Sequence, residues 1–88
     1  MVIGKVVGTV VSTRKNDDLT GCKLMVVENI WEKEQIKYVA VDQVGVGIGD
    51  FVLVTYGSAA RMGVGKEYSS IDAAIVGIID NEEEIYIK

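Results

Sequence analysis

Short runs rich in valine and isoleucine, separated by glycines and charged turns, restrict the fold of this chain more than any other feature. β-Branched and aromatic residues favour strands. The runs cover residues 2–12, 23–30, 36–41, 51–56, 71–80 and 84–88. The run 71–80 (IDAAIVGIID) also resembles a buried helix segment, but its β-branched residues and Gly77 favour a strand. The alternating EIYIK at residues 84–88 predicts a short edge strand.

About five strands in a chain of 88 residues predict an all-β fold. We expect a small OB-like five-stranded β-barrel that forms a single domain over residues 1–88. Closing the sheet removes its exposed edges. Glycines inside a strand, such as Gly4 and Gly8, let the strand bend around the barrel. One very short helix is expected at residues 58–62, with Ser58 as its N-cap.

Three glycines alternate in the segment DQVGVGIGD, residues 42–50, and raise the question of a phosphate-binding loop. A dinucleotide fingerprint needs the order G-x-G-x-x-G before a helix, and a P-loop needs a Lys-Ser or Lys-Thr pair. Here the third glycine comes one residue early and is followed by Asp50 and a strand-like run. We therefore interpret Gly45, Gly47 and Gly49 as a barrel corner, where glycine permits a positive φ or a close backbone approach.

The apolar content of the chain exceeds what a domain of this size needs for its own core. Hydrophobic residues make up 49% of the sequence and the mean hydropathy is +0.27. So short a chain buries only about 60% of its unfolded surface. No apolar run approaches the roughly 18 residues that span a bilayer, and the N-terminal sequence does not resemble a signal peptide. The surplus apolar surface therefore predicts a subunit interface, not a membrane partner.

The ionisable residues argue against several classes of function. The net charge of −4 and a pI near 4.6 disfavour a nucleic-acid surface. The lack of histidine disfavours an enzyme or a metal site, and we expect no catalytic residue, no cofactor and no metal. The single cysteine, Cys22, fits a reducing cytosol and is interpreted as a small buried hydrophobe. Two alternatives stay open: an OB-type single-stranded nucleic-acid-binding module and a small carboxylate-based hydrolase.

Several polar residues have both a functional and a simpler structural interpretation. Ser58 lies in GSAA, which is not the nucleophile elbow of hydrolases. Aspartates at the ends of expected strands usually cap backbone N–H groups, and three consecutive glutamates predict a solvated turn. These residues are Asp42, Asp50, Asp72, Asp80 and Glu82 to Glu84. Trp31, in the charged loop WEKEQ, is expected either to anchor an interface or to fold back over its own barrel.

Three segments together resemble the EutN/CcmL family of bacterial microcompartment vertex proteins. They are GTVVSTRKNDDLTGCKLMVV at residues 8–27, DQVGVGIGDFVLVTYGSAAR at residues 42–61 and IDAAIVGIID at residues 71–80. The resemblance implies a homopentameric ring that caps a vertex of a polyhedral shell, which hexameric shell proteins build elsewhere. It implies a place in the bacterial cytoplasm around enclosed enzymes, with no nucleic acid or membrane as partner. Val46, where relatives often have alanine, and Ser70, where proline is frequent, depart from the family pattern.

The segment GSAAR, which belongs to the second of these pieces, is the candidate site. Gly57, Ser58, Ala59, Ala60 and Arg61 are expected to form a subunit interface or to support the structure of the subunit. The planar guanidinium of Arg61 favours bidentate bonds. We expect it to bond a carboxylate or backbone carbonyls across or beside the subunit boundary.

Overall fold

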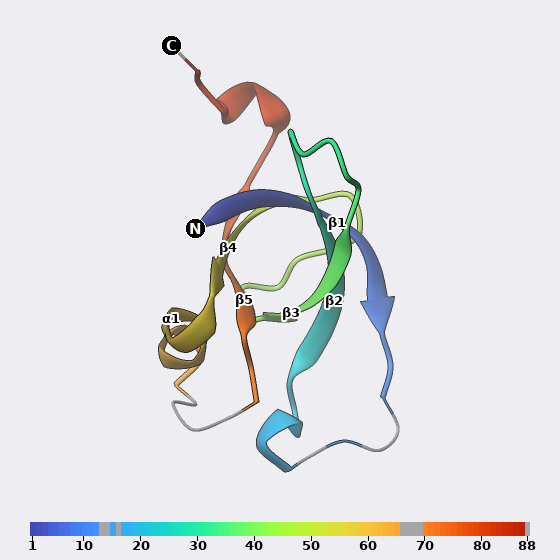
Figure 1. Ribbon diagram of the computed structural model, residues 1–88, viewed down its shortest axis with the longest axis vertical. Helices are drawn as coiled ribbons and strands as arrows, with labels where there is room; N and C mark the ends of the chain where they lie inside the picture. Colours follow the sequence, from blue (N-terminus) through green and yellow to red (C-terminus); the bar gives the residue numbers. More distant parts are fainter. Residues whose placement is uncertain (13–14, 16, 66–69, 88) are drawn as a thin grey trace.

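Five strands close into a barrel in the computed structural model, which describes residues 1–12, 15, 17–65 and 70–87 (Figure 1). The strands are β1 (Val2–Val10), β2 (Lys23–Asn29), β3 (Lys37–Asp42), β4 (Phe51–Tyr56) and β5 (Ala73–Ile79). Their order around the barrel is β1-β2-β3-β5-β4, and β4 pairs with β1 to close it. Neighbouring strands are antiparallel except β3 and β5, which pair in parallel where Val41 meets Ala74 and Asp42 meets Ile75.

β1 takes part in two sides of the barrel. It pairs with β4 from Val2 to Lys5 and with β2 from Gly4 onward. A bulge between Val6 and the following glycine, Gly8, marks where the register with β2 shifts and the strand bends. Glycine is required at position 4 because a Cβ there would overlap the side chain of Val27 on β2.

Side chains that alternate along each strand fill the barrel interior. On β4, Val52 and Val54 are fully buried, whereas Phe51 and Leu53 lie on the outer surface and are half-buried. The core consists of Val6, Met25, Val27, Ala40, Val46, Val52, Val54, Ala73 and Ile75. The same alternation leaves a second set of apolar side chains on the outside of the barrel.

Helix α1 (Gly57–Gly63) covers a smaller apolar cluster outside the barrel, at the place where β3 and β5 pair. The cluster consists of Val41, Ala60, Ile71 and Ala74, with Leu19, Cys22, Leu24 and Val64 packed against it. Leu19 comes from a 3₁₀ turn, η1 (Asp17–Leu19). Cys22 packs against this cluster but is only half-buried, so the expected buried cysteine is found in part.

The expected OB-like five-stranded barrel with one very short helix is confirmed, and β5 shows that residues 71–80 prefer strand over helix. Two local predictions are wrong. The helix begins at Gly57 with Tyr56 at its N-cap and no side-chain cap bond, so Ser58 does not cap it. EIYIK does not form an edge strand, because its glutamate belongs to a 3₁₀ turn, η2 (Glu82–Glu84), which leads away from the sheet (Figure 1). Residues 85–87 that follow are not in a strand, and Lys88 lies outside the described residues.

Candidate subunit interface

One outer side of the barrel, which we call face A, is formed by β1, β4 and β5. The register places Ile3 of β1 beside Leu53 of β4, and Phe51 of β4 beside Ile79 of β5. Val76, at the irregularity between β4 and β5, is 39% exposed. Face A therefore presents large apolar side chains on three adjacent strands, with Lys5 of β1 beside Phe51 and its ammonium group over the Phe51 ring.

The remaining two strands, β2 and β3, carry a second apolar surface, which we call face B. Their register places Val26 beside Val39 and Leu24 beside Val41 on the outside of the barrel. Val39 is 46% exposed. A groove of about 160 Å³ runs along this face, between β2, β3 and the segment that leads into β5. Face B thus differs from face A both in its residues and in its shape.

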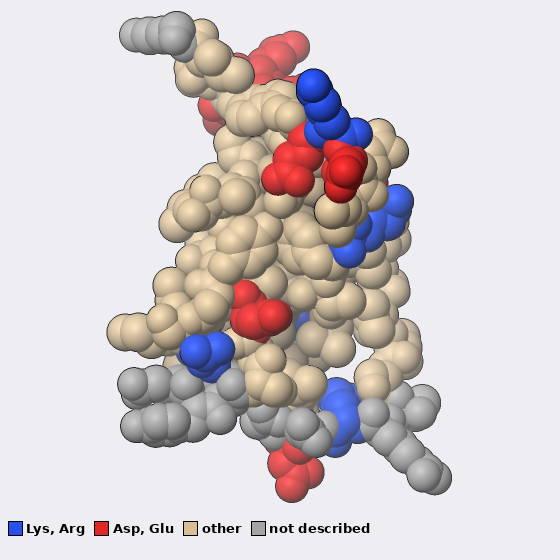
Figure 2. All heavy atoms as spheres, viewed as in Figure 1, with Lys and Arg blue, Asp and Glu red and all other residues tan. Residues whose placement is uncertain are grey.

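Charged side chains are unevenly distributed around these surfaces. On the side shown in Figure 2, acidic and basic side chains gather at the upper right, further charged side chains lie in the lower half, and much of the surface between them is uncharged. Extended apolar surface on a soluble subunit marks a contact with another protein. A closed ring needs two different patches on each subunit, since every interface joins one patch to the other. Faces A and B meet that requirement.

A buried carboxylate holds the glycine-rich loop between β3 and β4, residues 43–50, which we call the glycine loop. Asp42 Oδ1 accepts hydrogen bonds from the backbone N–H groups of Val44 (2.8 Å) and Gly45 (2.9 Å), and Oδ2 accepts one from Val46 (2.8 Å). Lys23 Nζ lies 3.4 Å from Oδ2 and donates to the carbonyl oxygen of Val46 (2.7 Å). Burial raises the pKa of Asp42, but the three N–H donors and Lys23 outweigh burial and bring the pKa below its ordinary value of 3.8.

The three alternating glycines of this loop are not equivalent. Gly45 and Gly49 have φ angles of 96° and 98°, in the left-handed region that favours glycine. Gly47 has no positive φ, and its N–H donates to Asp50 Oδ2 (2.8 Å). The N–H of Gly49 donates to the carbonyl oxygen of Val6 (2.8 Å), which ties the loop to β1. Both aspartates that bound the loop therefore cap backbone N–H groups, as their positions at strand ends predict.

The segment GSAAR forms the first turn of α1. Gly57 has a φ of 64°, and its N–H donates to the carbonyl oxygen of Asp72 (2.8 Å). Ala60 is fully buried under the helix, whereas Ser58 and Ala59 are exposed. Gly57 and Ala60 thus have structural roles within the subunit. The two residues between them are exposed and available for contact.

Arg61 connects the helix to the chain just before β5. Its side chain is half-buried, and Nη1 donates to the carbonyl oxygen of Ile71 (3.1 Å). The partner is a backbone carbonyl of the same chain, and Ile71 also lines the groove of face B. A bond from Arg61 across a subunit boundary stays a prediction.

The β2–β3 loop begins with an exposed turn from Asn29 to Glu32, which we call the Trp31 turn. Trp31 has a φ of 68° and is 66% exposed. The N–H of Ile30 donates to the carbonyl oxygen of Ile3 (3.2 Å), and the amide of Asn29 donates to the carboxylate of Glu32 (3.3 Å). A left-handed tryptophan is unusual, and nothing in the sequence signals it.

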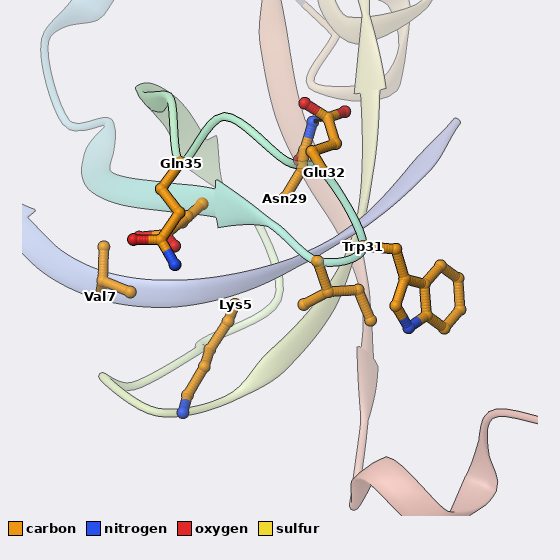
Figure 3. A pocket seen from close by; sticks show the side chains of 8 residues that line it. Lys5, Val7, Asn29, Trp31, Glu32 and Gln35 are labelled. Atoms are coloured by element: carbon orange, nitrogen blue, oxygen red, sulfur yellow. Dashed lines mark hydrogen bonds between the residues drawn. The ribbon is translucent and has the colours of Figure 1, made fainter.

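Two hollows lie on either side of the Trp31 turn. The smaller one, of about 160 Å³, has the Trp31 ring at one edge and Val7 and Gln35 at the other (Figure 3). The larger one, of about 310 Å³, is lined by the same ring together with Met1 and Ile3. Trp31 therefore stands between two open hollows and does not fold back over its own barrel.

The described part of the chain contains no candidate reaction centre. No group of three or more His, Cys, Asp or Glu within residues 1–12, 15, 17–65 and 70–87 is placed to hold a metal ion. The buried side-chain N and O atoms of these residues all have hydrogen-bond partners. None of the helices in these residues has the length and apolar character needed to cross a membrane.

These features define a small barrel subunit with apolar outer faces, and comparison with known proteins identifies its family. The family model described as "Ethanolamine utilisation protein EutN/carboxysome" matches residues 1–80. The bacterial microcompartment shell vertex protein GrpN of Rhodospirillum rubrum is 51% identical over 88 residues, which cover 97% of this chain and 99% of GrpN. The carboxysome shell vertex protein CcmL of Synechocystis sp. is 49% identical over 83 residues, which cover 91% of this chain and 83% of CcmL.

Solved structures that resemble this chain belong to the same family as these relatives. GrpN, a pentameric microcompartment shell protein from Rhodospirillum rubrum, has a TM-score of 0.81 at 49% identity and covers 97% of this chain and 100% of its own. An ethanolamine utilization protein, EutN, has a TM-score of 0.85 at 35% identity, over 91% of this chain and 86% of its own. The chain belongs to the EutN/CcmL family. It is a structural protein of the microcompartment shell, of the vertex class, and not an enzyme or a nucleic-acid-binding module.

Proposed function

We propose that five copies of this chain form a ring that closes a vertex of a bacterial microcompartment shell. The observation that carries the proposal is the pair of different apolar faces on one barrel, face A over β1, β4 and β5 and face B over β2 and β3. Joining face A of one copy to face B of the next buries both and repeats around a ring. The pentameric state of GrpN, which shares about half of its residues with this chain, supports a ring of five.

The partners of the ring are hexameric shell proteins, and the assembled shell lies in the bacterial cytoplasm around its enclosed enzymes. A sheet of hexagonal units is flat and cannot close into a polyhedron without five-fold positions. A small, rigid five-fold subunit ring fills such a position. The exposed Ser58 and Ala59 at the start of α1 are candidate contact residues of the ring, whereas Gly57, Ala60 and Arg61 support the subunit from within.

Electron microscopy of shells tests this function. Hexameric shell proteins expressed with this chain are expected to form closed polyhedra that contain it at their vertices. A Val39→Asp substitution places a charge on face B, where Val39 is 46% exposed, and is expected to leave shells open. Val11→Asp is the matched control, because Val11 is 86% exposed and lies beyond the end of β1. Closed shells that form equally well without this chain, and exclude it when it is present, would contradict the proposal.

A further inference from the structure

Two exposed apolar features lie at the same end of the barrel without covering each other. At the upper end of the long axis in Figure 1, the β2–β3 loop carries the Trp31 turn, and the chain leaves β5 through η2 into residues 85–87. Trp31 is 66% exposed, and Tyr86 and Ile87 are 82% and 75% exposed. We call residues 85–87 the C-terminal segment. Within one copy, neither the turn nor the segment is buried.

We propose that the Trp31 turn of one subunit receives the C-terminal segment of the adjacent copy. The proposal rests on the ring proposed above and names a contact within it. The family model ends at residue 80, so the segment is outside the part of the chain that defines the shared barrel. The contact is therefore an addition to the barrel-to-barrel packing of faces A and B.

The Trp31 turn has the properties of a preformed anchor site. Its backbone is fixed to β1 by the bond from Ile30 to Ile3, and Asn29 bonds Glu32 on one side and the hydroxyl groups of two tyrosines on the other. These bonds hold Trp31 at a φ of 68°, a conformation that is unfavourable for a tryptophan. A rigid aromatic side chain held outward loses little conformational entropy on binding, which is why tryptophan is frequent at the centre of interfaces.

The larger hollow beside the Trp31 ring matches the apolar side chains of the segment. It has a volume of about 310 Å³, is lined by Met1, Val2, Ile3 and Ile30 together with the polar Asn29 and Glu32, and has room for an isoleucine side chain or a tyrosine ring. The smaller hollow is lined by Lys5 but also by Glu28 and Glu32, so it offers no net attraction to the glutamates of η2. The contact therefore depends on apolar packing of Tyr86 and Ile87 beside Trp31.

Symmetry explains why the partner is a second copy. Rotation about a ring axis keeps each residue at the same height in every subunit. A turn and a segment at one end of the barrel can therefore meet across an interface when the barrel follows that axis. Each subunit then gives one segment and receives one, so every exposed Trp31 in the closed ring is covered.

Fluorescence of Trp31 tests the contact, because the sequence contains a single tryptophan. Acrylamide quenching is measured in the ring and in subunits separated by dilution, and native mass spectrometry confirms the state of each sample. We expect Trp31 to be quenched severalfold less in the ring than in separated subunits. A Tyr86→Ser, Ile87→Ser double variant is expected to restore quenching in rings of unchanged stoichiometry and to raise their dissociation concentration about tenfold. Val11→Ser, which changes a highly exposed valine beyond the end of β1, is the control and should change neither.

The outcomes separate the contact from the ring. Rings in which Trp31 is as accessible as in separated subunits would overturn the contact and leave the ring in place. Protection that survives the double variant would show that barrel packing covers Trp31, and protection already present in separated subunits would show that the segment folds back on its own chain. Either result overturns the proposal. A protein that forms no ring at any concentration overturns the proposed function together with this contact.

Discussion

The two loops on either side of β3 differ in what holds them. The glycine loop, which leaves β3, is fixed from inside by the buried carboxylate of Asp42 and by Val46, whose side chain is only 2% exposed and belongs to the barrel core. The loop that enters β3 is exposed at every residue from Trp31 to Gln35 and is held by a few bonds at its first turn. Both loops contain residues with positive φ.

The two loops differ in the type of residue that has the positive φ angle. In the glycine loop the positive φ angles fall on glycines, which adopt them without strain. In the other loop a positive φ falls on Trp31, where it is unfavourable. The first loop is therefore arranged for the stability of the barrel, and the second presents a side chain at some cost to stability. This cost is expected where a residue contacts a partner.

Removing the carboxylate of Asp42 should have the largest effect. Asp42→Ala leaves three N–H groups and Lys23 without their acceptor, and we expect a loss of about 3 kcal/mol in the free energy of unfolding. Glu32→Ala, in the Trp31 turn, should lose no more than about 0.5 kcal/mol. Urea unfolding at one protein concentration measures both, because assembly makes stability depend on concentration. Equal losses would remove the distinction between the two loops.

Acidification should weaken the glycine loop through the same carboxylate. The pKa of Asp42 in the folded protein lies below its ordinary value of 3.8, because the N–H donors and Lys23 outweigh burial. Its contribution to stability is therefore complete above about pH 4 and is lost as the pH falls through the folded value. Unfolding curves between neutral pH and pH 3 should show this loss in the wild type. The Asp42→Asn variant should lack this part of the pH dependence.

The three glycines should respond differently to alanine. Gly45→Ala and Gly49→Ala each force a side chain into a positive φ, and we expect each to cost about 1 kcal/mol or more. Gly47→Ala should cost less, because its φ is not positive and the nearest atom to an added Cβ is Asp50 Oδ2 at 3.9 Å. The melting temperatures of the three alanine variants, measured under the same conditions, test this prediction. Three equal values would contradict the assignment of positive φ as the reason for glycine.

Arg61→Ala should cost about 1 kcal/mol, since it removes one hydrogen bond from a charged donor to the carbonyl oxygen of Ile71. Arg61→Lys keeps the charge and should recover part of this loss. Thermal unfolding gives the subunit effect, and the oligomer mass at several dilutions gives the ring effect. A ring that dissociates more readily would place Arg61 beside the subunit boundary, whereas an unchanged ring would restrict it to supporting α1.

Trp31→Gly should have a small effect on the subunit and a clear effect on the ring. Glycine relieves the positive φ at position 31, so the free energy of unfolding of separated subunits should change by less than about 1 kcal/mol, toward greater stability. The ring should dissociate at a concentration about tenfold higher. This response is opposite to that of Gly45→Ala, and a destabilised subunit would show that Trp31 supports the fold.

Much of the barrel could be predicted from the sequence because its strands alternate. Val52 and Val54 face the core between outward Phe51 and Leu53, and this period is visible in the sequence. The capping role of Asp42 also followed from its place at a strand end. The faces could not be predicted, because the register that sets Ile3 beside Leu53 joins residues far apart in the chain.

The two wrong predictions, a strand at EIYIK and an N-cap at Ser58, also have physical reasons. EIYIK has the alternation of a strand, but a strand also needs a partner edge, and the chain turns away from the sheet at η2, which includes the first residue of this segment. Ser58 has the chemistry of an N-cap, but Gly57, with a φ of 64°, already belongs to the helix. The conformation of Trp31 depends on bonds from Ile30 to β1 and within the turn, which no local pattern reveals.

The mass of the assembled protein tests the central claim, that faces A and B join copies of this barrel into a ring of five. Native mass spectrometry at micromolar protein concentration measures it without labels or partners. The account predicts a dominant species at five times the 9.5 kDa mass of the subunit. A single-subunit mass at every concentration tested would contradict it.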